Sequence, residues 1–351
     1  MPIPWITLAA IFCGCFLSAS ACSQAADRTP EGEAVAAGRA LIGLPAPSLD
    51  LTTIDGELIA LGELYGKKAV YLKFWATWCI PCRQQMPHFE RVYQTAGASL
   101  AVVGVNVGMN DPLAEVRRFR DEHDIHMPIV IDDGRLGAAL NLQITPQHVV
   151  IGRDGRVRYV GHLANESLDA ALAEARSIEG PPVRRTDGKV QTIARYGIGD
   201  RLPDMTATTV DGQSFRARAA GERRPTVLVF LSPWCESYLA GSRPAVSLHC
   251  RLVREQVEVL VRERADVRWL GIASGLWATQ LEMDEYRAKH GTELPLTLDE
   301  SGEWFRAFDV MDVPTVILAD GDGRLVRRVN GFESGWPSEL QPLLESETAV
   351  R

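Results

Sequence analysis

The stretch AVYLKFWATWCIPCRQQMPHFE, residues 69–90, decides the fold of the first half of the chain. Residues 69–74 are apolar and aromatic apart from one lysine, which is typical of a short buried strand. The turn ATW follows, and the composition from Cys79 onward is helical. The sequence therefore predicts that Cys79 and Cys82 lie in the first turn of a helix that follows a buried strand.

Two cysteines at this spacing indicate redox chemistry. Unpaired backbone N–H groups and the helix dipole stabilise a thiolate there and lower the pKa of the first cysteine, Cys79. Cys82, one turn later, can reach back and close a disulfide, so the pair can cycle between dithiol and disulfide. The alternative is half of a zinc site, which needs a second ligand pair. The nearest candidate, HDIHM at residues 123–127, is more typical of an exposed helix end. We therefore predict no metal and no cofactor beyond the Cys79–Cys82 disulfide.

Three stretches carry a resemblance to a known family: FWATWCIPC (74–82), GLPAPSLDLTTIDGELIAL (43–61) and LQITPQHVVIGRDGRVRYVGH (142–162). In them the chain resembles the thioredoxin superfamily, specifically the exported TlpA/ResA-like thiol-disulfide oxidoreductases, over about residues 42–176. The resemblance implies an α/β fold with a mixed central sheet flanked by helices. It also implies Cys79 and Cys82 as catalytic residues and protein thiols or disulfides as substrates.

The resemblance also assigns substrate-binding residues. In the family, a cis-proline that precedes a strand faces the cysteine pair and leaves the backbone before it free to pair with a substrate peptide. Thr145 and Pro146 stand at that place here. The alternative for Pro146 is an ordinary trans turn proline. Trp78, beside Cys79, would flank the docking surface.

Two residues depart from the family pattern. Thioredoxins commonly place a buried carboxylate where this chain has Lys73, and ResA-like proteins place an acidic residue where it has Gln85. A cation near the thiols would favour the thiolate. The alternative is that Lys73 extends its amine to water. The resemblance therefore predicts the fold and the dithiol chemistry, but neither the redox potential nor the proton relay.

The second half of the chain repeats landmarks of the first. IGLPAPSLDLTTIDG at 42–56 pairs with IGDRLPDMTATTVDG at 198–212, and Cys79 pairs with Cys235 at the same offset of 156 (235 − 79). Pro146 pairs with Pro314 at an offset of 168 (314 − 146). We therefore predict two tandem thioredoxin-like domains with 12 residues (168 − 156) added in the second, mainly in its long helical tract.

Each half predicts the same order of elements: strand, site helix, strand, helix, two hairpin strands and a last helix. At 351 residues, the chain is long enough for two domains. The predicted organisation is a signal peptide (1–26), a flexible spacer (27–41), a catalytic domain (42–176), a linker (177–196) and a degenerate second domain (197–348).

The second domain keeps half of a redox site. Cys235 corresponds to Cys79, and the same helix start would activate its thiol, but Tyr238 takes the place of Cys82. The candidate second site consists of Trp234, Cys235, Val313 and Pro314. We favour a non-catalytic module that binds substrates or partners. The alternatives are an inert relic and a peroxiredoxin-like peroxidase that uses Cys235.

Cys250 is the remaining cysteine of the second half. It lies fifteen residues beyond Cys235, which is about 22 Å along a continuous helix and outside disulfide reach. A helix break at Gly241 and Pro244 would bring the two cysteines together. We expect the continuous helix and no internal disulfide.

The first 26 residues predict export. They carry no charge and contain an apolar run from Ile6 to Leu17, which is too short to span a bilayer but typical of a secretory signal. Small residues before Cys22 offer a cleavage site and resemble a bacterial lipoprotein signal, in which Cys22 is lipidated. An uncleaved anchor is the alternative. Export would place the protein in the periplasm or cell envelope, an oxidising compartment, and would associate its N-terminus with the membrane.

Charge and family together limit the partners. A formal net charge of −8 argues against nucleic acid. The resemblance implies protein substrates, a membrane electron donor and a reductase direction.

Overall fold

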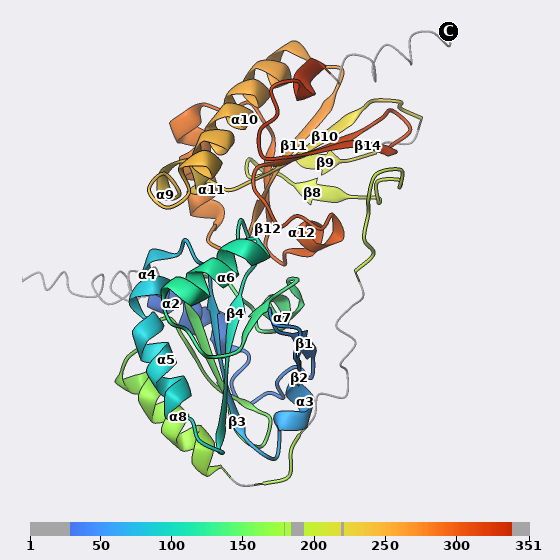
Figure 1. Cartoon of the computed structure of the whole chain (residues 1–351). Helices are drawn as coiled ribbons and strands as arrows, with labels where there is room; N and C mark the ends of the chain where they lie inside the picture. The colour runs from blue at the N-terminus through green and yellow to red at the C-terminus, as the bar shows by residue number, and fades with distance from the viewer. Residues whose placement is uncertain (1–28, 179, 184–192, 219–220, 339–351) are drawn as a thin grey trace, which may run out of the picture.

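The computed structural model describes residues 29–178, 180–183, 193–218 and 221–338, and shows two α/β domains (Figure 1). Each has a five-stranded mixed sheet, ordered β5-β4-β3-β6-β7 in the first domain and β12-β11-β10-β13-β14 in the second. A two-stranded sheet, β1-β2 or β8-β9, precedes each one. The matching orders confirm the predicted pair of thioredoxin-like domains. The predicted signal peptide and Cys22 lie outside the described residues.

The first domain is built around β3, all of whose side chains are buried. Its strands are β1 (Asp50–Thr52), β2 (Leu58–Ala60), β3 (Ala69–Trp75), β4 (Leu100–Asn106), β5 (Ile129–Ile131), β6 (Gln147–Ile151) and β7 (Val157–Gly161). Its helices are α2 (Pro30–Arg39), α3 (Leu61–Leu64), α4 (Ile80–Gln84), α5 (Met86–Gln94), α6 (Leu113–Glu122), α7 (Arg135–Ala139) and α8 (Glu166–Ser177). β3 runs parallel to β4 and antiparallel to β6, and its carboxyl end leads directly to the cysteine pair.

The second domain repeats this plan around β10, which is also buried along its whole length. Its strands are β8 (Thr206–Thr208), β9 (Ser214–Arg216), β10 (Thr226–Leu231), β11 (Arg268–Ser274), β12 (Leu296–Asp299), β13 (Thr315–Ala319) and β14 (Leu325–Asn330). Its helices are α9 (Cys235–Tyr238), α10 (Pro244–Glu263), α11 (Gln280–His290) and α12 (Glu303–Ala307). Most of the segment expected to form the closing helix, up to residue 348, lies outside the described residues.

Strand register locates the added residues of the second domain. Trp75 lies opposite Asn106 in the first sheet, and its counterpart Leu231 lies opposite Ala273 in the second. The offset has thus grown from 156 (231 − 75) to 167 (273 − 106) between these two strands. Eleven of the twelve added residues therefore precede β11, where α10 has 20 residues and α5 has 9. The predicted position of the insertion is confirmed.

The predicted flexible spacer is wrong for most of its length, because residues 30–39 form α2. Thr29 caps this helix by accepting the N–H of Gly32, and Pro30 occupies its first position, where no N–H partner is needed. The Glu31 carboxylate accepts the backbone N–H of His162, just beyond β7. These contacts tie the segment to the first domain.

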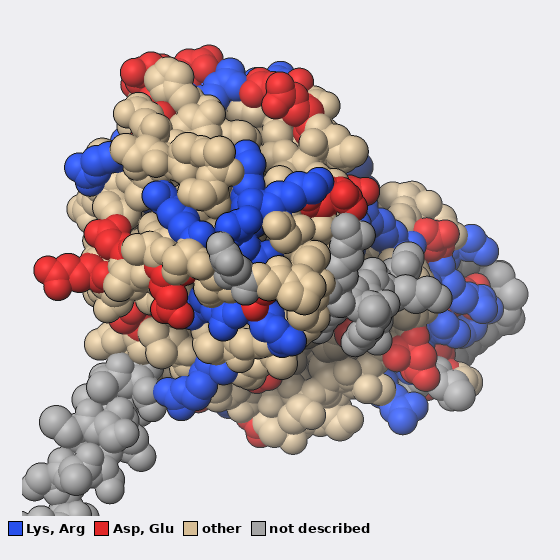
Figure 2. All heavy atoms as spheres, turned by 90° about the horizontal axis from the view of Figure 1, so that it is seen from below, with Lys and Arg blue, Asp and Glu red and all other residues tan. Residues whose placement is uncertain are grey.

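The surface carries charges of both signs. On the face shown in Figure 2, Lys and Arg side chains gather near the middle, with Asp and Glu around them. Among the described residues, no helix is both long enough and apolar enough to cross a membrane. Figure 1 shows α9 and α12 of the second domain facing α4, α6 and α7 of the first.

Candidate functional site

Cys79 and Cys82 form a disulfide at the start of α4, with their Cα atoms 5.2 Å apart. Cys79 is the N-cap residue of this helix, and its Sγ accepts the backbone N–H of Cys82 at 3.2 Å. The same N–H would stabilise a Cys79 thiolate once the bond is reduced. Cys79 is 2% exposed and Cys82 is fully buried.

The Thr145–Pro146 segment lies at the same edge of the sheet as the cysteine pair. Gln147, the first residue of β6, is opposite Phe74 near the carboxyl end of β3. The Thr145–Pro146 bond is cis, and Thr145 is buried. The structure therefore brings the predicted docking residues to the edge at which β3 leads into Trp78 and Cys79.

Lys73 is fully buried beneath the cysteines. Its Nζ donates a hydrogen bond to the Cys82 backbone oxygen at 3.2 Å and lies 5.3 Å from the ring centroid of Phe89. Burial lowers the pKa of the Lys73 amine from 10.5 to about 7. The alternative in which this amine reaches water is therefore wrong, and a group that can gain or lose a proton near neutral pH lies beside Cys82.

A directed chain of hydrogen bonds lies next to Lys73. The Gln85 amide Nε2 donates to the His162 backbone oxygen at 3.1 Å, so its Oε1 is free to accept the Nε2–H of His148 at 2.7 Å. His148 Nδ1 then accepts the Tyr71 hydroxyl at 2.7 Å. Burial, and next the charge of Lys73, hold the pKa of His148 well below its usual value. Gln85 thus orients a neutral histidine instead of supplying a charge.

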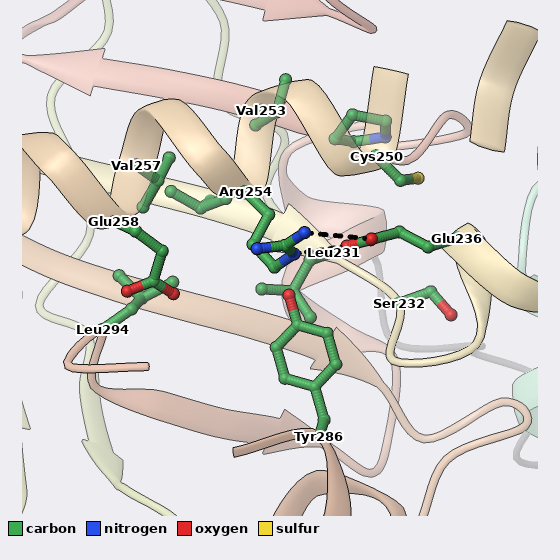
Figure 3. A pocket seen from close by; sticks show the side chains of 12 residues that line it. Leu231, Ser232, Glu236, Cys250, Val253, Arg254, Val257, Glu258, Tyr286 and Leu294 are labelled. Carbon is green, nitrogen blue, oxygen red and sulfur yellow. Dashed lines mark hydrogen bonds and ion pairs between the residues drawn. The ribbon is translucent and has the colours of Figure 1, made fainter. Parts of the chain in front are cut away.

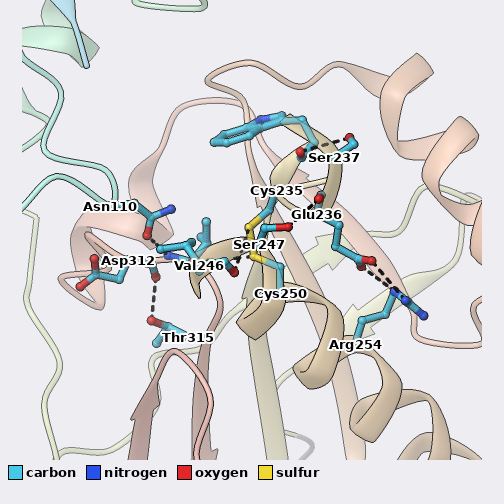
Figure 4. The surroundings of a disulfide bond; sticks show 12 residues. Asn110, Cys235, Glu236, Ser237, Val246, Ser247, Cys250, Arg254, Asp312 and Thr315 are labelled. Atoms are coloured by element: carbon cyan, nitrogen blue, oxygen red, sulfur yellow. Dashed lines mark hydrogen bonds and ion pairs between the residues drawn. A yellow bond between two sulfur atoms is a disulfide. The ribbon is translucent and has the colours of Figure 1, made fainter. Parts of the chain in front are cut away.

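The second domain contains a disulfide that we did not expect, between Cys235 and Cys250 (Figure 4). The expected continuous helix is wrong, because α9 ends at Tyr238 and α10 begins at Pro244. Proline can begin a helix but cannot continue one. The turn between the helices brings the two Cα atoms to 6.2 Å. Pro244 was the sequence signal for this break.

The second disulfide lies beside a second cis-proline. The Val313–Pro314 bond is cis, and Cys250 Sγ is 3.9 Å from the Val313 backbone oxygen. Cys250 therefore reaches the second candidate site from α10, although Tyr238 occupies the position of the missing resolving cysteine. Cys235 is fully buried, and Cys250 is 9% exposed.

An ion pair holds α9 against α10 next to this disulfide. Arg254 donates to the Glu236 carboxylate at 2.6 Å, and both side chains line a small pocket with Cys250 and Tyr286 (Figure 3). Ser247 also donates its hydroxyl to the Glu236 backbone oxygen at 2.7 Å. The disulfide and these bonds together fix the position of α9.

Three aromatic residues of the second domain lie over Trp78. Trp234 stacks on it with ring centroids 5.1 Å apart, and Trp277 meets it edge-on at 4.9 Å. Tyr238 meets it edge-on at 6.1 Å, and its hydroxyl accepts the backbone N–H of Ile80 at 3.1 Å. We call Trp234, Tyr238 and Trp277 the aromatic cap. Sequence reasoning named Trp234 as part of a second site, but it gave no role to Trp277.

Comparison with known proteins places the first domain. The model of the AhpC/TSA family matches residues 42–160. The thioredoxin-like protein YneN of Bacillus subtilis is 36% identical over 37% of this chain and 78% of its own length. The thiol-disulfide oxidoreductase ResA of Halalkalibacterium halodurans is 36% identical over 33% of this chain and 65% of its own length. A solved thiol:disulfide interchange protein from Chlorobium tepidum TLS is 28% identical over 38% of this chain and 97% of that chain, with a TM-score of 0.35.

The two relatives match about a third of the chain, so they bear on the first domain, whereas the repeated sheet order relates the second domain to it. The disulfide at the start of α4 agrees with their names. The protein is therefore an oxidoreductase of the thiol-disulfide class. The chain belongs to the thioredoxin-like thiol-disulfide oxidoreductases, the family that includes YneN and ResA.

Proposed function

We propose that the protein reduces disulfides of partner proteins in the bacterial cell envelope, with Cys79 as the nucleophile and Cys82 as the resolving thiol. The observation that carries this proposal is the Cys79–Cys82 disulfide, which lies at the sheet edge that also holds the cis Thr145–Pro146 bond. Trp78 and Thr145 would flank the partner peptide.

The reaction consists of two thiol-disulfide exchanges. The Cys79 thiolate attacks one sulfur of the partner disulfide, the partner bond breaks, and one partner thiolate leaves from the mixed disulfide. The Cys82 thiolate then attacks Cys79 Sγ and releases the second partner thiolate. The partner gains two electrons and two protons, and the pair is left as the observed disulfide. An external dithiol restores the reduced enzyme.

Lys73 supports the second exchange. Its buried Nζ lies at the Cys82 backbone and has a pKa of about 7. The ammonium form favours the Cys82 thiolate, whereas the free amine can accept the thiol proton. Either form promotes the resolving step near neutral pH.

The location in the cell envelope rests on the N-terminal sequence. The apolar run from Ile6 to Leu17 and the small residues before Cys22 support export followed by lipidation. A membrane electron donor would fit an anchored reductase.

Single substitutions of cysteine in the full chain test the reaction. Cys79→Ser should abolish the reduction of insulin by dithiothreitol above the uncatalysed rate. Cys82→Ser should accumulate a mixed disulfide between Cys79 and the partner, which mass spectrometry of the peptide 74–83 would locate. Cys235→Ser is the matched control and should retain turnover. Full activity in Cys79→Ser would disprove the assignment.

A second function is supported for the C-terminal domain, which we propose as a binding module for the first domain rather than a second enzyme. Its aromatic cap contacts Trp78, and its disulfide fixes α9, from which Tyr238 projects. We do not propose peroxidase activity, because Cys235 is buried and bonded to Cys250.

A further inference from the structure

The two domains contact each other through equivalent residues. Asn110 donates its backbone N–H to the Met311 oxygen at 2.8 Å, and Trp277 donates its backbone N–H to the Gln143 oxygen, also at 2.8 Å. The donors are 167 residues apart (277 − 110), the offset between β4 and β11, and the acceptors are 168 apart (311 − 143), the offset of the cis-prolines. Each domain thus places the same loop against the cis-proline loop of the other.

The backbone of both donors is specialised for this contact. Asn110 has φ 50° and Trp277 has φ 64°, in the left-handed region that a bulky residue rarely adopts. Such a conformation persists only where the surrounding contacts hold it, and it is common at ligand clamps and switch regions. Trp277 in particular combines this backbone with a side chain inserted between the domains.

Trp277 lies on the docking residues of the first domain. Besides the backbone bond to Gln143, its Nε1 donates to the Thr145 hydroxyl oxygen at 2.9 Å, and its ring contacts Trp78 at 4.9 Å. Its backbone N–H therefore pairs three residues before the cis-proline, at the surface where a peptide would bind. Tyr238 takes the N–H of Ile80, the residue after Cys79. With the domains together, Trp78 and Cys79 are each 2% exposed.

A polar contact closes one side of the interface. The Arg243 guanidinium lies 3.2 Å from the Asp111 carboxylate and 3.4 Å from that of Glu115, and it also donates to the Thr77 hydroxyl. Asp111 is buried and also accepts the Thr77 backbone N–H at 2.7 Å. If the domains separate, water can solvate both charges, so this ion pair can be exchanged for hydration.

From these contacts we propose that the second domain is a reversible internal lid on the redox site. In the closed state the aromatic cap occupies the docking surface of the first domain, and a folded protein substrate reaches Cys79 only after the cap has moved away. The lid deepens the proposed function, on which it rests for the nature of the substrate. The pairing of equivalent loops makes it a self-recognition surface, in which the second domain fits the first as a second copy would.

The first test measures access to Cys79 without any need for turnover. In a Cys82→Ser chain, the rate at which a polyether-linked maleimide labels Cys79 is followed by peptide mass spectrometry. Each aromatic pair is worth about a factor of 2 to 10, so adding Trp277→Ala and Arg243→Ala should raise the rate by about tenfold or more. Leu248→Ala with Arg251→Ala, two exposed residues of α10, is the matched control and should leave the rate unchanged. Equal rates in all three chains would overturn the lid.

The second test uses the unaltered chain, so it does not depend on how well the variants fold. Amide hydrogen exchange at Asn110 and Trp277 should occur at one common rate, faster than exchange within β3 and β10, because both bonds break when the lid opens. Exchange as slow as in the two central strands would show a rigid interface and refute the proposal. Neither test measures disulfide reduction, so a failure of the lid and a failure of the reductase assignment are distinguishable.

Discussion

Trp78 and Trp234 stack across the domain boundary with ring centroids 5.1 Å apart, although they hold the same position in two successive domains, 156 residues apart (234 − 78). Equivalent residues meet in this way only near an axis that relates the two domains. The reciprocal bonds of Asn110 and Trp277 agree with such an axis. The redox face of each domain is therefore turned toward the other.

Removing one ring of this stack should loosen the interface. An aromatic pair contributes about 0.5–1.5 kcal/mol beyond the area it buries, and Trp234 also contacts Trp277 at 5.3 Å. Trp234→Ala should therefore uncouple the domains, so that urea unfolding followed by fluorescence and by far-UV circular dichroism gives two transitions. Trp234→Phe, which keeps a ring, should retain more of the coupling. An unchanged single transition in Trp234→Ala would contradict the role of the stack.

Lys73→Met should stabilise the protein most at low pH. The pKa of Lys73 is about 7 in the folded chain against 10.5 as its ordinary value. Between these values the unfolded chain binds a proton that the folded chain does not, so the free energy of unfolding rises with pH across this window. Below pH 7 the full cost of burying the ammonium remains, at about 1.4 kcal/mol per pKa unit.

Urea unfolding at pH 6 and at pH 10 measures this difference. Lys73→Met should gain a few kcal/mol over the unaltered chain at pH 6, and the gain should nearly vanish at pH 10. Lys67→Met, at an exposed site, is the control and should show no such dependence. A constant gain at both values would show that Lys73 is not titrating as proposed.

Cys250→Ser should destabilise the second domain without stopping turnover. The Cys235–Cys250 bond closes a loop of 15 residues, and in the chain-entropy model its loss costs about 3 kcal/mol. The Cys79–Cys82 bond has a separation of 3, and the same model gives about 1.6 kcal/mol for Cys82→Ser. Denaturation under non-reducing conditions compares the two. Loss of insulin reduction in a folded Cys250→Ser protein would instead assign the second disulfide to the reaction.

His148 should remain neutral over the physiological range. Burial and the nearby Lys73 lower the pKa of its ring well below 6.5. The hydrogen bond to Gln85 should place the proton on Nε2. Nitrogen NMR of the ring should therefore show one neutral tautomer from pH 5 to pH 8, and Gln85→Leu should release that tautomer. A titration with its midpoint near 6.5 would contradict this arrangement.

The sequence by itself determined the features that depend on local chain chemistry. The apolar run 69–74 predicted β3, and the spacing of Cys79 and Cys82 allowed a disulfide within one helical turn. The repeated offsets predicted two matching domains and placed the insertion before β11. These signals are readable because backbone periodicity and helix capping act between residues that are close in the chain.

Only the tertiary structure decided the contacts between distant residues. Lys73 is buried because β3 is covered on both faces, which one position of a strand does not reveal. Cys250 reaches Cys235 because five residues, 239–243, turn the chain back between two helices. The aromatic cap lies over Cys79 because two folded surfaces are complementary, a property that depends on the packing of both domains and appears in neither sequence alone.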